Sequence, residues 1–227
     1  MGKKSSKQSE FIKNVKMTKP NNMEYTTVIP NAKARDKYVK RVERVVRQSM
    51  EYRDYIAFLK EHMDLDSCIF FQNVTSKGKK RVSIELHHEP FTLYDYVNVV
   101  LQKFIDEGMP LNDLMIADEV LEMHYANQVG LVPLSKTAHQ IIHNSEKLLV
   151  PLNMVYGQYS EFLEKYDNYI DEDKLGVDLY DKLSRKMEMT KNLTPESFDA
   201  IKKEFTYLEV DGFEDIQKMD VEGEAIA

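Results

Sequence analysis

Residues 131–143 read LVPLSKTAHQIIH, and this stretch decides the fold that we expect. Its first half is short and apolar, as in a buried strand, and its second half places His139 and His143 four residues apart in a helix-like run. Ser135, between the two halves, is of a residue type that caps helix N-termini. Side chains four apart on a helix share one face, with Cβ atoms about 5–6 Å apart. The stretch therefore predicts a strand that leads directly into a helix with two histidines on one side.

A second histidine pair, His87 and His88, ends an alternating, strand-like run over 81–86. The chain has six histidines, and four of them fall in these two places. A strand end and a helical pair can converge on one metal ion, so the sequence predicts a metal site, with phosphodiester chemistry as its use. The remaining two, His62 and His124, are expected to be ordinary surface or core residues.

Composition is that of one globular domain with extensions, because hydrophobic residues make up 42% and charged residues 30% of the 227 positions. The single cysteine, Cys68, excludes an intramolecular disulfide and a Cys-rich zinc site. A reducing cytoplasm, the host cytoplasm if the protein is phage-encoded, is the compartment we expect. No apolar run approaches the roughly 18 residues that span a bilayer, so no membrane partner is expected.

Charge divides the chain into two parts. Residues 1–50 carry thirteen Lys or Arg and four Asp or Glu, whereas the remainder carries 18 basic and 34 acidic residues. Residues 1–34 are polar and interrupted by Pro20 and Pro30, so we expect a basic, partly disordered arm. Residues 209–227 hold seven acids and one Lys and are expected to form an acidic tail. Residues 35–208 are left as the single globular domain.

Helical spacing of apolar residues predicts most of that domain to be helical. Thr92 is the expected N-cap of the second helix, and Asn112 or Asp113 that of the third. The expected helices cover 36–62, 91–107, 112–127, 135–144, 154–170, 173–190 and 195–207. Residues 67–72 and 81–88 are predicted to pair as a β-hairpin. Basic residues near its tip are expected to contact phosphates, with a solvated surface as the open alternative; they are Lys77, Lys79, Lys80 and Arg81.

The segments ELHHEP at 85–90 and LVPLSKTAHQIIH at 131–143 together resemble the HNH endonucleases, and most closely those of the colicin DNase type. The resemblance covers roughly residues 81–145, and the surrounding sequence is similar to small phage-encoded HNH proteins. It implies a ββα-metal core over 67–145, with C-terminal helices over 146–208. About 40 residues separate the two motifs, so an inserted helical pair over 91–127 is expected.

By position, the resemblance implies that His87, His139 and His143 bind one divalent metal ion and that His88 is the general base that activates water. An imidazole suits the role of base near neutral pH. Three imidazole ligands favour zinc, nickel or manganese over magnesium. Glu85 and Glu89 flank the pair and can orient an imidazole, although an exposed strand charge is the preferred interpretation for Glu89.

One position departs from the family pattern. The Asn that gives HNH its middle letter aligns with Gly130, and Asn127, three residues upstream, is the candidate substitute for bracing or orienting the site.

The fold class expected is thus α+β and mostly helical, with an HNH-like core surrounded by additional helices. The function expected is a metal-dependent endonuclease that acts on nucleic acid, with double-stranded DNA as substrate. Phage replication or packaging proteins are further partners that the resemblance implies. The alternative is a catalytically inactive, zinc-stabilised module of the same fold that binds nucleic acid or protein. An all-helical interaction protein without metal is the third interpretation.

Overall fold

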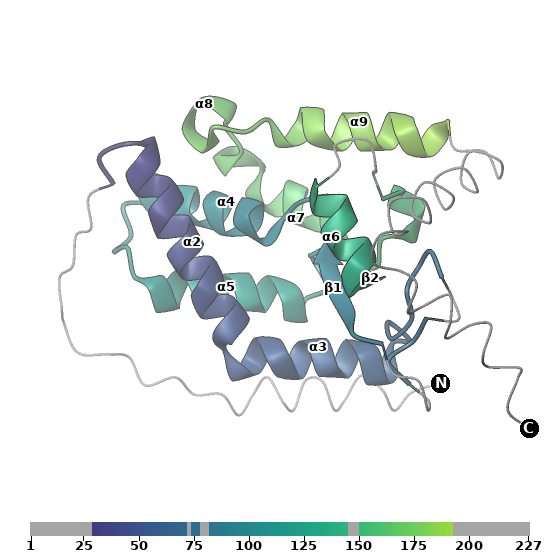
Figure 1. Ribbon diagram of the computed structural model, residues 1–227. Coiled ribbons are helices and arrows are strands. Elements are labelled where there is room, and N and C mark those ends of the chain that lie inside the picture. The colour runs from purple at the N-terminus through teal and green to yellow at the C-terminus, as the bar shows by residue number, and fades with distance from the viewer. Residues whose placement is uncertain (1–28, 72–73, 78–81, 145–149, 193–227) are drawn as a thin grey trace, which may run out of the picture.

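The computed structural model describes residues 29–71, 74–77, 82–144 and 150–192 (Figure 1). These residues are mostly helical and include one small two-stranded antiparallel sheet, so the expected α+β class is confirmed. No helix among them is long and apolar enough to cross a membrane. Residues 1–28 of the predicted arm, the helix predicted over 195–207 and the acidic tail over 209–227 all lie outside the described ranges.

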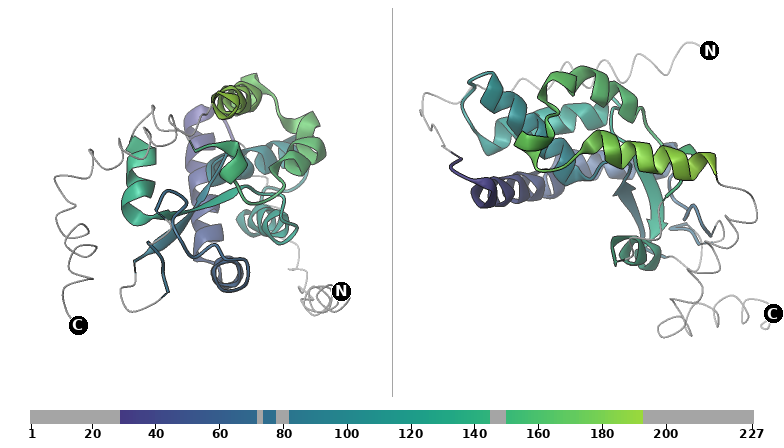
Figure 2. Two further views of the ribbon diagram at one scale, coloured as in Figure 1. Left: turned by 90° about the vertical axis from the view of Figure 1, so that its right-hand side faces the viewer. Right: turned by 90° about the horizontal axis from the view of Figure 1, so that it is seen from above.

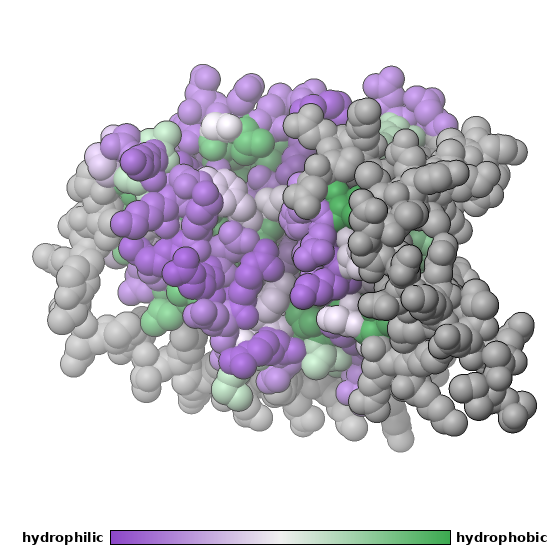
Figure 3. Space-filling model, in the orientation of Figure 1, coloured by the Kyte–Doolittle hydropathy of each residue, from purple (hydrophilic) through white to green (hydrophobic). Residues whose placement is uncertain are grey.

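The helix predicted over 36–62 is two helices, α2 (Ala32–Gln48) and α3 (Met50–His62), and Ser49 separates them. The Ser49 hydroxyl accepts from the backbone of Tyr52 and donates to the carbonyl of Val46. Such local side-chain bonds compete with the helical ladder, so the chain turns here. α2 begins four residues earlier than expected because Asn31 caps it. Its inner face is buried and its outward face is hydrophilic (Figure 3).

Both caps expected for the next two helices are confirmed. Thr92 caps α4 (Leu93–Asp106) in a reciprocal capping box with Asp95, whose side chain accepts from the Thr92 backbone. Asn112 caps α5 (Asp113–Tyr125) by accepting from Leu114 at 2.8 Å. Each cap satisfies backbone N–H groups that have no partner inside the helix. The two helices therefore begin where short polar side chains supply the missing acceptors.

The sheet joins β1 (Ile84–His88) to β2 (Leu131–Ser135), with His87 opposite Val132 and His88 opposite Leu131. The predicted hairpin between 67–72 and 81–88 is therefore wrong. Ser67 makes only an isolated bridge to Thr75, and the Ile69 N–H donates to Pro133 on the outer edge of β2. Every residue of β2 is buried, so this continuous apolar segment takes the central position between the two others.

Helix α6 (Lys136–Asn144) follows β2 without a loop, and the Ser135 hydroxyl accepts from Ala138 as the expected cap. The C-terminal part is more broken than the two helices predicted over 154–170 and 173–190. It consists of η1 (Leu152–Met154), α7 (Tyr159–Tyr166), η2 (Asp167–Tyr169), α8 (Glu172–Leu175) and α9 (Leu179–Lys191). Gly176, with φ +70°, ends α8 in the left-handed region.

Two apolar clusters hold these elements together. The larger lies among α2, α3, α4, α5 and α7 and includes Val42, Val100 and Phe162. The smaller joins the sheet to α6 through Val132, Leu134 and Ala138 and includes Cys68. Figure 2 shows the sheet and α6 projecting from the helical body. Helices α4 and α5 lie between β1 and β2 in the sequence, where an inserted helical pair was expected. They form part of the main apolar core and are not a peripheral insertion.

Gly130 lies where the chain enters β2 and crosses close to Glu89 at the end of β1. A Cβ atom on residue 130 would come within 1.8 Å of the Glu89 carbonyl oxygen. The Gly130 carbonyl accepts from the Glu89 N–H at 3.0 Å, and the Gly130 N–H donates to the Tyr96 hydroxyl. Glycine is required here by the close approach of two backbones, and no asparagine side chain can occupy this position.

The substitution Gly130→Ala is expected to destabilise the fold by about 3 kcal/mol or more, because a backbone must move to admit the new atom. Gly108→Ala is the matched control, since residue 108 has φ +63° but nothing within 4 Å of the added atom. Backbone strain alone should cost the control about 1 kcal/mol. Urea unfolding of both variants measures the difference, and equal losses would contradict the steric explanation.

Candidate metal centre

Three histidines from two elements gather at the junction of the sheet and α6. His87 comes from β1, and His139 and His143 from successive turns of α6. Each offers a ring nitrogen, and these nitrogens all lie within 4.8 Å of one another. The ring centroid of His87 lies 5.0 Å from the ring centroid of each helical histidine. The structure thus brings together the three residues that the sequence analysis assigned to a metal.

Glu85 fixes the orientation of one of these rings. It lies two residues before His87, so strand alternation puts both side chains on the β1 face that α6 covers. A Glu85 carboxylate oxygen lies 2.5 Å from Nδ1 of His139, which identifies Nδ1 as the protonated donor and leaves Nε2 as a free lone pair. That Nε2 lies 3.0 Å from Nε2 of His143. Glu85 therefore lies where the sequence analysis expected an orienting residue.

This donor set fits a divalent ion of the zinc type. Tetrahedral ligands about 2.0–2.1 Å from a metal stand roughly 3.3 Å apart, which small side-chain movements can reach from the observed separations. Burial lowers the pKa of all three imidazoles, and that of His87 to about 3, with the neighbouring His143 as the next cause. The rings are therefore neutral near pH 7, as metal ligands must be.

Two further residues lie near His87: Glu89, which was considered as an orienting residue, and Lys186, which was not anticipated from the sequence. Glu89 is buried, not an exposed strand charge, and one of its oxygens lies 3.5 Å from Nε2 of His87. Its other oxygen pairs with the ammonium of Lys186 on α9. The carboxylate is thus held between a histidine and a buried lysine, which offsets the cost of burying its charge. Glu89 was a candidate because it flanks the histidine pair, but no local signal marks a lysine 97 positions away.

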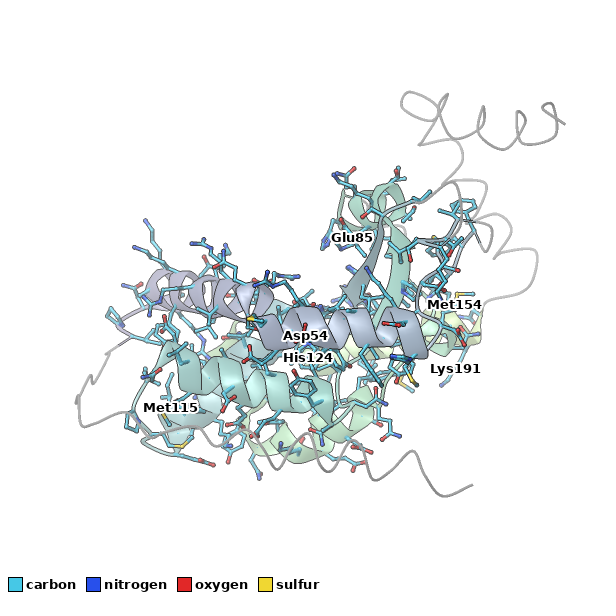
Figure 4. All side chains as sticks on the ribbon, turned by 90° about the horizontal axis from the view of Figure 1, so that it is seen from below. Asp54, Glu85, Met115, His124, Met154 and Lys191 are labelled. Atoms are coloured by element: carbon cyan, nitrogen blue, oxygen red, sulfur yellow. The ribbon has the colours of Figure 1, made fainter. Side chains whose placement is uncertain are left out.

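His88 lies on the other face of β1 and is separated from the three-histidine cluster. Its ring is buried, stacks on Tyr52 at 6.3 Å and places Nε2 at 2.9 Å from Nε2 of His124. His124 Nδ1 donates to the Val120 carbonyl, so His124 accepts through Nε2 and His88 donates. Figure 4 shows Glu85 on the side of β1 and α6 and His124 among the helices. The placement of His88 argues against water activation by its ring in this arrangement.

Asn127 has a structural explanation instead of a place near the histidines. It follows α5 with φ +59°, and its N–H donates to His124 while the next N–H donates to Met123. This pair of bonds is the Schellman pattern that ends helices, and Asn is one of the residue types that tolerate the left-handed conformation there. Its side-chain oxygen is buried without a hydrogen-bond partner among the described residues. Among the described residues, the Asn127 side chain makes no hydrogen bond to the three histidines, so nothing supports the orienting role expected for it.

Of the expected phosphate-binding residues, the structure describes one. Lys77 is exposed, and its ammonium lies 2.9 Å from the Asp66 carboxylate. Lys79, Lys80 and Arg81 lie outside the described residues. Their contact with nucleic acid therefore stays a prediction.

The His88–His124 pair predicts a loss of stability in acid. Burial lowers the pKa of His124 to about 4, below the value near 6.5 in an unfolded chain. Above pH 6.5 neither state holds this proton. Between pH 6.5 and 4 the unfolded chain takes it up and the folded chain does not, so the free energy of unfolding falls by about 3 kcal/mol.

Urea unfolding at stepped pH measures this loss. The variant His124→Gln keeps a polar group beside His88 but cannot titrate in this range, so its pH profile should be flatter by the stated amount. Parallel profiles for the two proteins would show that His124 is not the group responsible.

Comparison with known proteins gives one match. Residues 2–211 match the family described as bacteriophage G278-like virion protein. No curated protein and no solved structure matches the chain. Because the family match spans nearly the whole sequence, the chain belongs to the bacteriophage G278-like virion protein family.

Proposed function

We propose that this virion-family protein is a metal-dependent endonuclease of the HNH type that hydrolyses phosphodiester bonds in DNA. One observation carries the proposal. Strand β2 pairs with β1 and continues directly into α6, and His87, His139 and His143 from these elements gather at one point. This is the order of elements and ligands that the resemblance to HNH endonucleases implies. The carboxylate behind His139 adds an orienting partner of the kind that metal-binding histidines usually have.

The openness of the cluster favours catalysis over a purely structural role. Structural zinc sites close the shell with four protein ligands, whereas catalytic sites use three and leave a position for water or substrate. Here three histidines gather among the described residues, and their solvent exposure increases from buried His87 through His139 to exposed His143. When bound, the ion would supply positive charge for a phosphate oxygen and the leaving oxygen. The chain's own part is to hold three neutral imidazoles and keep one side of the cluster accessible.

The role of general base that the resemblance implies for His88 stays a prediction and is not part of this proposal. Its Nε2 proton is engaged by His124, and its ring is enclosed by Tyr52 and Tyr96. A base must reach the water from which it takes a proton. We therefore assign no proton transfer to His88 in the arrangement described.

The second candidate function is a metal-stabilised, catalytically inactive module, and two observations favour it. The family's Asn position is Gly130, where a side chain would collide with Glu89, and His88 is buried on the far face of β1. Virion-family membership is compatible with either function. It favours the phage particle over the host cytoplasm as the place of action and other virion proteins as partners.

Metal analysis followed by plasmid cleavage separates these functions. The purified full chain is expected to bind one zinc, nickel or manganese ion, and to cleave plasmid DNA in its presence. His143→Ala should lose both properties, whereas His62→Ala, on an exposed histidine outside the cluster, should keep both. Bound metal without cleavage under any ion would favour the inactive module, and absence of metal would reject both functions. Cleavage that survives in His88→Ala would reject His88 as the base.

Glu85→Gln is expected to weaken metal binding about 10–100-fold without unfolding the protein, because His139 loses the carboxylate that fixes its ring. Isothermal titration with zinc measures the affinity. Glu61→Gln, on an exposed acid of α3, is the control and should bind as the wild type does. An unchanged affinity for Glu85→Gln would remove the orienting role from this residue.

A further inference from the structure

The outward face of α2 carries a single stripe of positive charge. Five basic residues recur at intervals of four, three, four and three positions along this helix, and all five are exposed: Lys33, Lys37, Lys40, Arg44 and Arg47. At 3.6 residues per turn these intervals keep the side chains within one narrow sector. The sector lies opposite the buried positions Tyr38, Val39, Val42 and Val46. The stripe is thus a property of the folded helix, and the hydrophilic surface over α2 is visible in Figure 3.

Such a stripe is unfavourable for the isolated protein. Like charges three or four residues apart on a helix repel each other, at about 0.2–0.5 kcal/mol for each pair. Two acids relieve the repulsion at the side: Asp36 lies 3.0 Å from Lys40, and Glu43 lies 2.8 Å from Arg47. Both pairs are largely exposed and therefore weak. Among the described residues, Lys33, Lys37 and Arg44 have no acidic partner, which leaves the stripe without a matching counter-charge.

The stripe also stands against the charge of the rest of the chain. Residues beyond 50 carry 34 acids and 18 bases. The exposed surface of α9, by comparison, mixes the signs, as in the pair Arg185 and Asp181 at 2.6 Å. A protein that is acidic overall but lines one helix face with basic residues is suited to present that face to a polyanion.

The C-terminal end of the stripe is connected to β1 through the next helix, α3. Arg47 precedes Ser49 by two residues, and Tyr52 in the next turn stacks on the ring of His88. His88 adjoins the metal-site residue His87 on β1. The stripe therefore ends next to the helix whose Tyr52 packs against the histidine-bearing strand β1.

We propose that the α2 stripe binds the sugar–phosphate backbone of duplex DNA and leads that duplex to the three-histidine centre. The fourteen-residue interval from Lys33 to Arg47 spans about 21 Å. B-DNA carries one negative charge per ~1.7 Å of axis, so every basic residue of the stripe meets phosphate along a straight duplex. The binding surface stands on α2 alone, whereas its connection to cleavage rests on the proposed function.

The test is the salt dependence of DNA binding by the full chain. A fluorescent 20-base-pair duplex is titrated at several NaCl concentrations, with chelator present so that metal and cleavage play no part. The triple variant Lys33→Gln, Lys37→Gln and Arg44→Gln should reduce the slope of log K against log[NaCl] by about 2.7 relative to wild type, since each lost phosphate contact removes about 0.9. Glutamine keeps helix propensity, so the variant should fold, which urea unfolding verifies.

The matched control removes three charges from exposed positions elsewhere: Lys165→Gln, Arg185→Gln and Lys191→Gln. Its slope should equal that of the wild type. The six lysines of residues 1–28 are the same in all proteins, so they cancel in the comparison. Equal slopes for both triple variants and the wild type would overturn the proposal. So would displacement of the labelled duplex by polyglutamate as effectively as by unlabelled DNA. Because chelator is present throughout, loss of metal binding or of cleavage in the earlier experiments leaves this result independent.

Discussion

The pairing of β1 with β2 is the constraint on which the rest of the structure depends. Its register sets His87 opposite Val132 and His88 opposite Leu131, and strand alternation then sends adjacent histidines to opposite faces. A shift by one residue would exchange them, placing His88 under α6 and His87 among the helices. The contact between Gly130 and Glu89 pins this register, because the two backbones can approach so closely only where residue 130 lacks a side chain. The glycine at position 130 thereby helps to set which of the two histidines joins the three-histidine cluster.

The two halves of the molecule divide the work between them. The helices α2 to α5 and α7 supply the large apolar cluster, which a short sheet and one helix could not provide alone. The sheet and α6 supply the three-histidine cluster and have only a small apolar cluster of their own. Buried polar contacts join the halves: His88 meets His124 on α5, and Glu89 meets Lys186 on α9. The geometry of the histidine centre is therefore tied to helices distant in sequence.

The features that could be predicted from the sequence are those that depend on residues close together in the chain. The caps at Thr92, Asn112 and Ser135 and the spacing of His139 and His143 were all readable, because a cap or a helical pair involves residues within four positions. The strand partner of β1 was not, since residues 67–72 offered an apolar run as attractive as the true partner 43 or more positions away. The split at Ser49 was missed because a serine inside an apolar repeat is compatible with either a continuous or a broken helix.

The two histidines at the end of β1 show why a motif places residues better than it assigns their chemistry. His87 and His88 have the same side chain and adjacent positions, yet one adjoins an accessible cluster and the other donates a hydrogen bond in the core. In the core, a neutral His88 matched to His124 satisfies two buried polar rings that would otherwise destabilise the fold. Proton transfer by His88 would require its hydrogen bond to His124 to break. Both buried rings would then lose their partner, which would destabilise the fold. The proposed catalysis therefore fits the open side of α6, where His143 meets solvent, better than the buried side that holds His88.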